Sequence, residues 1–140
     1  MLRTTPARDQ SHVHRIKSEL DLSVALAQLR KWSMVNGFDA PGATRLVTAA
    51  SEIGRNILKY AGKGELRYRP VAEGRKTGVE VATVDQGPGI ADIELAMQDR
   101  FSSSGTLGLG LPGVKRLVDR FDINSSPESG THVTFRLWKR

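Results

Sequence analysis

An aspartate at the end of an apolar run could bind an amino group of a ligand. Asp85 directly follows the run VEVATV, and Gly87 and Gly89 flank Pro88. A carboxylate held at a strand end can accept a hydrogen bond from an exocyclic amine such as that of adenine. The two glycines allow positive φ angles and a close approach of the backbone to a ligand. They would also suit an ordinary turn, so this stretch alone leaves both interpretations open.

A second set of polar residues recurs every four positions. The stretch SEIGRNILKYAG contains Glu52, Asn56 and Tyr60 at this spacing. Each step of four residues rotates an α-helix by only about 40°, so the three side chains form one narrow stripe. Ile53 and Ile57 fall on the neighbouring stripe, which places the polar line at the margin of the core, where a pocket wall would be. The alternative is an exposed helix edge with ordinary polar pairs.

A glycine-rich stretch, SSSGTLGLGLPGVKRL, could bind an anion. Gly105, Gly108 and Gly110 precede an expected helix, whose first N–H groups are free and carry partial positive charge. Gly108, Gly110 and Gly113 also spell G-x-G-x-x-G, but no buried strand precedes them, which argues against a dinucleotide site. No G-K-[ST] follows, so the stretch is not a Walker P-loop. A glycine-rich loop without a ligand is the remaining alternative.

Apolar periodicity and turn residues place these groups in one α+β layered domain. We expect Asp21 to cap the first helix, Gly37 to end it, and Asp39 with Pro41 to begin the second. Residues 1–11 are expected to be a flexible tail and 12–140 a single domain. The predicted strands cover residues 12–20, 65–73, 78–85, 121–126 and 131–138. The predicted helices cover 22–37, 41–61, 90–98 and 112–120, with a loop at 99–110.

The composition excludes several classes of protein. The 140 residues contain no cysteine, which rules out disulfides and thiolate metal sites. No apolar run is long enough to span a bilayer and no signal peptide is evident, so we expect a cytoplasmic protein with no membrane partner. The net charge is +6, but the basic residues are scattered, which favours a basic surface or an acidic partner over nucleic-acid binding. The spacing of the three histidines predicts no metal site.

The order of these motifs resembles one ATP-binding family. An E-x-x-x-N helix, D-x-G-x-G at a strand end, a G-x-x-G-x-G loop and a late Gly-Thr pair occur in that order in the GHKL, or Bergerat-fold, domain of gyrase, Hsp90 chaperones, histidine kinases and MutL. The resemblance covers roughly residues 12–138. EIGRNILKYAGKGE, DQGPGIADIELAMQD and GLGLPGVKRLVDRF look most similar to the RsbT-type switch-protein serine/threonine kinases, and less so to the anti-sigma kinases RsbW and SpoIIAB. The resemblance to this family implies a two-layer α/β sandwich, in which helices cover one face of a mixed, mostly antiparallel sheet.

The same resemblance implies a role for each motif residue. Glu52 would be the general base that takes the proton from a serine hydroxyl, and Asn56 would bind a Mg²⁺ ion that bridges the phosphates of ATP. Asp85 would bind the adenine amino group, and residues 101–106 would form a closing lid. The implied ATP-binding residues are Asn56, Lys59, Tyr60, Asp85, Gly87, Gly89, Ile90, Ser104, Gly105, Thr106, Gly108, Leu109, Gly110 and Thr131.

The resemblance also implies partners. The expected substrates are STAS-domain proteins of the RsbS and RsbR type, and the released kinase would activate a PP2C-type phosphatase of the RsbU type. The alternative is an anti-sigma factor or nucleotide-gated switch that sequesters its partner without turnover. Two residues depart from the family pattern: Gly54 and Thr106 stand where Ala and Gly are expected. In a helix interior, Gly54 costs about 1 kcal/mol relative to alanine.

Overall fold

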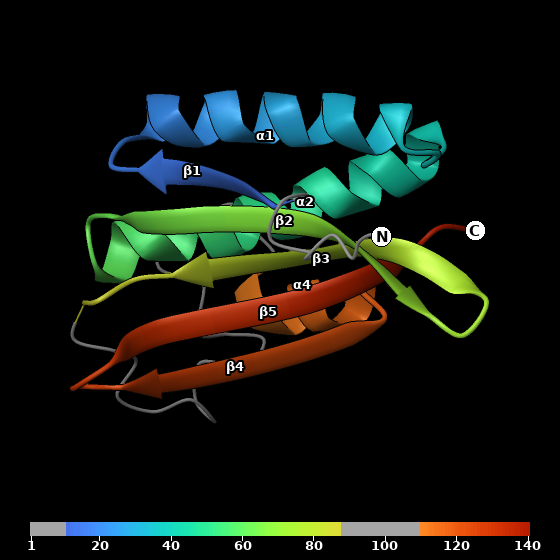
Figure 1. Ribbon diagram of the computed structural model, residues 1–140. Helices are drawn as coiled ribbons and strands as arrows, with labels where there is room; N and C mark the ends of the chain where they lie inside the picture. The colour runs from blue at the N-terminus through green and yellow to red at the C-terminus, as the bar shows by residue number, and fades with distance from the viewer. Residues whose placement is uncertain (1–10, 88–109) are drawn as a thin grey trace, which may run out of the picture.

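The computed structural model describes residues 11–87 and 110–140 (Figure 1). Of the predicted tail only Ser11 is described, the helix predicted over 90–98 lies outside the described residues, and of the loop predicted over 99–110 only Gly110 is described. The elements are, in chain order, β1 (His12–Ile16), α1 (Glu19–Val35), α2 (Ala40–Tyr60), β2 (Gly64–Glu73), β3 (Lys76–Val84), α4 (Gly110–Leu117), β4 (Arg120–Ser126) and β5 (Gly130–Trp138).

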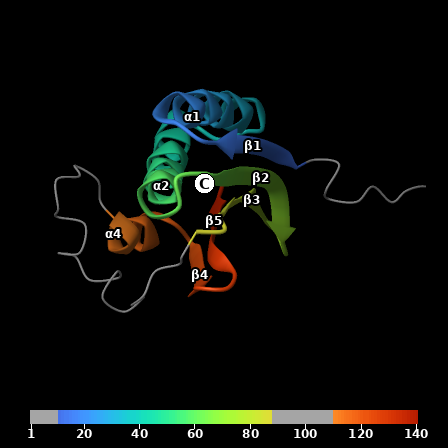
Figure 2. The same cartoon turned by 90° about the vertical axis from the view of Figure 1, so that its left-hand side faces the viewer.

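The strands form one sheet in the order β1-β2-β3-β5-β4. The expected sheet was mixed and mostly antiparallel; all four strand pairings in the described residues are antiparallel. Helices α2 and α4 lie against one face of the sheet, and α1 lies beside α2 and β1 (Figure 2). This arrangement confirms the predicted α+β fold, with the core between the helices and one face of the sheet.

The connection from β1 to α1 differs from the prediction. The strand ends at Ile16 rather than continuing to residue 20, and the helix begins at Glu19. Ser18, not Asp21, is the N-cap, because its hydroxyl accepts the backbone N–H of Asp21 at 3.1 Å. The Asp21 carboxylate in turn accepts the N–H of Lys17 at 2.9 Å. Asp21 is therefore the third residue of the helix, and its carboxylate stabilises the turn before the cap without being the cap itself.

Helix α2 begins and packs as predicted. Asp39 is its N-cap and accepts the backbone N–H of Gly42 at 2.8 Å. The face that contains Leu46, Ile53 and Ile57 is fully buried, as the apolar spacing indicates. The core residues that face it from the sheet are Leu66, Tyr68, Val79, Val81, Val133, Phe135 and Leu137. Because this face is buried, the neighbouring polar stripe of Glu52, Asn56 and Tyr60 has a fixed position at the margin of the core.

Gly54 has a packing role that the sequence does not show. It lies on the buried side of α2, where an added Cβ would come within 2.5 Å of Leu22 Cδ1 on α1. The missing side chain lets the two helices approach closely, so the helix-propensity cost expected for this glycine is offset by packing. Helix α4 begins at Gly110 rather than at the predicted Pro112, and Pro112 lies within its first turn, where its ring is tolerated.

Within residues 11–87 and 110–140, none of the helices is long and apolar enough to cross a lipid bilayer.

Candidate functional site

Asp85 is held firmly at the end of β3. Its side chain is buried, and its Oδ1 accepts the backbone N–H of Gly87 at 3.0 Å and that of Thr131 at 3.2 Å. Its own N–H donates to the Thr131 carbonyl at 3.0 Å. The two bonds with Thr131 join segments that are 46 positions apart in the chain. The carboxylate is therefore fixed in position before any ligand arrives, which favours a specific contact with a ligand.

Glycines permit the close packing around Asp85. Gly130 has φ of +75°, and a Cβ there would come within 2.0 Å of the Asp85 carbonyl oxygen. At Gly87, a Cβ would come within 2.5 Å of the Ala61 Cβ at the end of α2. We expected Gly87 to make room for a nucleotide, but in this structure the adjacent space is filled by Ala61. The requirement for glycine at this position thus comes from contact between two segments of the protein.

Thr131 is buried beside Asp85. Its Oγ1 lies 2.8 Å from the hydroxyl of Ser125 on the paired strand β4. Ser125 is not among the site residues that the sequence predicts. Its spacing carries no signal, because only the pairing of β4 with β5 places it opposite Thr131.

Glu52 meets the first backbone N–H of helix α4. Its Oε1 accepts a hydrogen bond from Gly110 N at 3.0 Å, and Oε2 lies 3.7 Å from Arg55 Nη1 one turn further along α2. The Glu52 side chain is 13% exposed. A carboxylate at a helix N-terminus is stabilised by the free N–H groups and the helix dipole. Arg55 was also absent from the predicted site, although its spacing of three residues from Glu52 is a signal for an ion pair.

The remaining residues of the polar stripe continue along α2. Asn56 is half-buried, and Tyr60 lies at the C-terminal end of the helix, where its burial raises the pKa of the phenol above its ordinary value. Lys59 places its Nζ 5.3 Å from the centroid of the Tyr60 ring, close enough for a cation–π interaction. An added Cβ at Gly87 would lie 3.1 Å from the Tyr60 carbonyl oxygen. The end of the stripe is therefore next to the Asp85 segment.

The structure thus brings together two parts of the predicted site. Asp85, Gly87 and Thr131 form one group, and Glu52 with the start of α4 forms the other, with Asn56 on the helix between Glu52 and the Asp85 segment. Seven predicted residues lie outside the described part of the chain: Gly89, Ile90, Ser104, Gly105, Thr106, Gly108 and Leu109.

The described residues include groups of the kind that contact nucleotides in proteins. A buried carboxylate can accept from an amino group, and a helix N-terminus can interact with phosphate oxygens. Mg²⁺ is commonly held by one or two protein oxygens together with substrate phosphates, which the Asn56 amide oxygen could supply. Among the described residues, no group of three acidic, histidine or cysteine side chains is placed to hold a metal by itself.

Comparisons with known proteins agree with this geometry. Residues 42–140 match the family described as histidine kinase-, DNA gyrase B- and HSP90-like ATPase. The serine/threonine-protein kinase RsbT of Bacillus subtilis is 46% identical over 132 residues, which cover 94% of this chain and 98% of that protein. An anti-sigma F factor of a Thermoanaerobacter species is 34% identical over 92 residues, or 61% of this chain and 63% of that factor.

A solved structure shows the same fold. The crystal structure of the RsbU and RsbW domains of a Mycobacterium tuberculosis protein superposes with a TM-score of 0.62 at 20% sequence identity. The match covers 92% of this chain and 33% of that chain. The sequence and fold comparisons confirm the expected membership: the chain belongs to the histidine kinase-, gyrase- and HSP90-like ATPase family, among the serine/threonine-protein kinases of the RsbT type.

Proposed function

We propose that this chain transfers phosphate from ATP, with Mg²⁺, to a serine of a STAS-domain partner of the RsbS or RsbR type. The chain freed from that partner would then activate a PP2C-type phosphatase of the RsbU type. The observation that carries the proposal is the contact of Glu52 with the N-terminus of α4, which places a carboxylate beside the helix start where phosphate is expected to bind. The likeness to RsbT over nearly the whole chain supports it.

The residues would divide the reaction between binding and proton transfer. Asp85, fixed by Thr131 and Gly87, would accept a hydrogen bond from the adenine amino group and so orient the nucleotide. The N–H groups of Leu111 and Gly113 in the first turn of α4 would bind phosphate oxygens, since Glu52 accepts the N–H of Gly110 and Pro112 has none. Glu52 would take the proton of the attacking serine hydroxyl, since a general base must lie within hydrogen-bond reach of that proton.

Mg²⁺ would supply charge neutralisation on the phosphates, with Asn56 as its protein ligand. Lys59 would contact phosphate and Tyr60 would lie against the base. The glycines and the lid expected at residues 101–106 would add backbone N–H groups and exclude water. A cytoplasmic location remains a prediction from the sequence.

The test has two stages, of which the first is nucleotide binding. Calorimetry with ATP and ADP, with and without Mg²⁺, should show binding by the wild-type chain and at least about tenfold weaker binding by Asp85→Asn, because a charged acceptor is lost. Asp122→Asn, at an exposed position of β4, is the matched control and should bind as wild type. Equal binding by Asp85→Asn and wild type would contradict the adenine contact.

The second stage is phosphate transfer. Intact-mass spectra of an RsbS-type STAS protein should show one added phosphate after incubation with the chain and Mg-ATP, and none with Glu52→Ala. A partner that stays unmodified while the chain binds ATP tightly would rule out the kinase proposal.

A second function is favoured by the anti-sigma F factor relatives, at 34% identity over 61% of this chain. In that case the chain would sequester a partner under the control of bound nucleotide. The Glu52→Ala variant distinguishes the kinase function from the sequestering function. If the variant still binds ATP and still releases its partner, phosphate transfer is not needed for switching.

A further inference from the structure

A basic cavity of about 340 Å³ opens at the end of the sheet where β1 and β3 finish. This volume is at the lower limit of typical ligand pockets. Its walls come from the end of β1, the turn between α2 and β2, the start of β2 and the end of β3. The charged residues that line it are Arg15, Lys17, Lys63, Arg67, Glu65 and Asp85.

The cavity lies on the face of the sheet opposite the core. Arg15 is paired with Glu65, and Glu65 with Val84, so these three residues lie on one face. The neighbouring residues Leu66 and Thr83 are buried on the other face, against the helices. The catalytic side of the proposed site, where Glu52 meets α4, is on that helix side (Figure 2). The basic cavity shares only the segment at Asp85 with the proposed nucleotide site.

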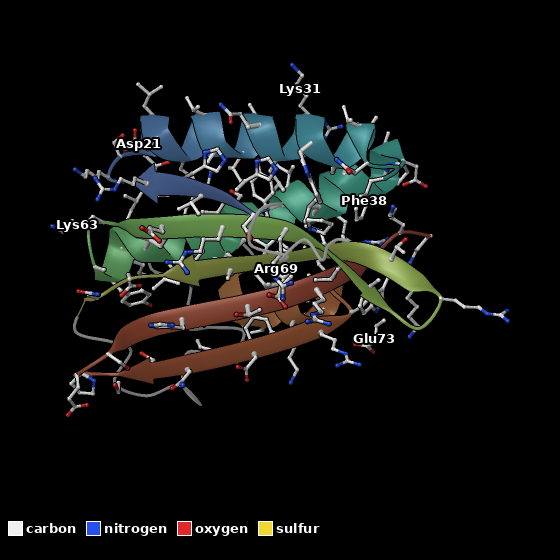
Figure 3. All side chains as sticks on the ribbon, viewed as in Figure 1. Asp21, Lys31, Phe38, Lys63, Arg69 and Glu73 are labelled. Carbon is white, nitrogen blue, oxygen red and sulfur yellow. The ribbon has the colours of Figure 1, made fainter. Side chains whose placement is uncertain are left out.

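Elsewhere on this open face, positive charge is neutralised by ion pairs. Glu80 binds Arg69 at 3.1 Å and Arg136 at 2.9 Å. Glu73 binds Arg136 at 3.4 Å and also binds Arg120. Figure 3 shows Arg69 near the middle of the sheet and Glu73 toward its other end. The centre of the face therefore carries a connected network in which each arginine has a carboxylate partner.

The cavity differs from this network because most of its positive charge is not neutralised. Arg67 is paired with Glu65 at 2.6 Å. Arg15, Lys17 and Lys63 are exposed, and among residues 11–87 and 110–140 none of them forms an ion pair with a carboxylate. Figure 3 shows Lys63 at the turn before β2, at one end of the sheet. Three unneutralised cations around one cavity attract a negatively charged ligand.

The distribution of charge indicates what kind of anion would fit. Arg15 and Lys17 are two positions apart, about 7 Å along an extended chain, and Lys63 comes from a different connection. Charges spread in this way match several carboxylates along an extended segment better than one compact anion.

We propose that this cavity docks an acidic segment of a partner protein. The docking contacts come from Arg15, Lys17 and Lys63 and not from Glu52 or Asn56, although Asp85 lies in the wall of both sites. Guanidinium and ammonium groups at its rim would pair with glutamate and aspartate side chains of the segment, and the exposed setting makes each pair modest and sensitive to salt.

The test is a binding titration of the full chain with a labelled hexaglutamate peptide, followed by amide NMR shifts at low salt. The largest shifts should fall on residues 15–17, 63–67 and 84–86. The double variant Arg15→Gln/Lys63→Gln should bind about tenfold more weakly, since two exposed ion pairs are lost. The matched control is Lys31→Gln/Arg75→Gln, which removes the same charge from exposed positions on α1 and in the β2–β3 turn. Figure 3 shows Lys31 pointing away from the sheet.

Inorganic phosphate and Mg-ATP are titrated in parallel to determine whether the cavity binds carboxylates or phosphates. Equal weakening in both double variants would overturn the proposal, because binding would then depend only on net charge. If phosphate or ATP shifted the same residues and required Arg15 and Lys63 while the peptide did not bind, the cavity would be a phosphate site. Circular dichroism on each variant confirms that the fold is retained.

Discussion

Glu52 Oε1 lies 3.0 Å from the backbone nitrogen of Gly110 and accepts its N–H, so a residue of α2 caps the start of α4. The carboxylate proposed as a general base therefore also stabilises the packing of the two helices. The two roles can be separated by substitution, because an amide oxygen can accept the same hydrogen bond but cannot take a proton at neutral pH.

Glu52→Gln should lower phosphate transfer by about 10²- to 10⁴-fold, the usual contribution of a general base. Its melting temperature and ATP affinity should stay near wild type, because the cap is kept. Glu52→Ala should lose both activity and about 1 kcal/mol of stability. Single-turnover transfer assays and thermal melts measure the two effects. Transfer by Glu52→Gln within a few-fold of wild type would show that another group accepts the proton.

Gly130→Ala should destabilise the fold strongly. Its φ of +75° is unfavourable for alanine, and the new Cβ would lie 2.0 Å from the Asp85 carbonyl oxygen, so β5 must move away from Asp85. We expect a loss of about 3 kcal/mol or more, and with it weaker ATP binding.

Gly62→Ala is the control for backbone strain alone. Gly62 has φ of +83°, but no heavy atom lies within 4 Å of an added Cβ. Its cost should be only about 1–2 kcal/mol. Urea unfolding gives both values, and similar losses in the two variants would show that the contact with Asp85 is relaxed at little cost.

Gly54→Ala tests close packing between α1 and α2. Alanine gains about 1 kcal/mol in helix propensity, but its Cβ would meet the fully buried side chain of Leu22. Overpacking typically costs 1–3 kcal/mol, so we expect a net loss of stability of up to about 2 kcal/mol. Ser51→Ala, on the same helix and half-buried, should change stability by less than about 0.5 kcal/mol. A higher melting temperature for Gly54→Ala would mean that Leu22 changes rotamer freely.

The attachment of β1 should weaken in acid. His12 and His14 both stack on Tyr68, with ring centroids 4.8 and 5.5 Å away, and His14 Nε2 lies 3.3 Å from the Tyr68 hydroxyl. Burial, and then the charge of His12, lower the pKa of His14 below its ordinary value of about 6.5. The folded state therefore binds this proton less readily than the unfolded state, and stability falls as the pH drops below about 6.5.

Thermal melts between about pH 7.5 and 5.5 should show this loss in the wild type and a flatter profile in His14→Gln. His12→Gln should raise the pKa of His14, measured by NMR titration, because it removes the repelling charge. An unchanged pKa of His14 in that variant would show that burial alone lowers the pKa.

Rules that relate short stretches of sequence to helices, strands and caps predict much of the secondary structure of this protein. The stripe of Glu52, Asn56 and Tyr60 follows from helical geometry, and the cap at Asp39 follows from the residues that come after it. Alternating apolar residues indicated the five strands. Local rules were wrong at Asp21, because Ser18 offers the same capping chemistry three positions earlier and only the end of β1 at Ile16 decides between them.

The tertiary structure decided the contacts between distant segments. The bond of Asp85 to Thr131 requires β3 and β5 to be neighbours, and the bond of Glu52 to Gly110 requires α4 to lie beside α2. Arg15 and Lys63 line one cavity only because β1 pairs with β2. Sequence spacing determines neighbours within one helix or strand, whereas the order of strands and the packing of helices determine which elements meet.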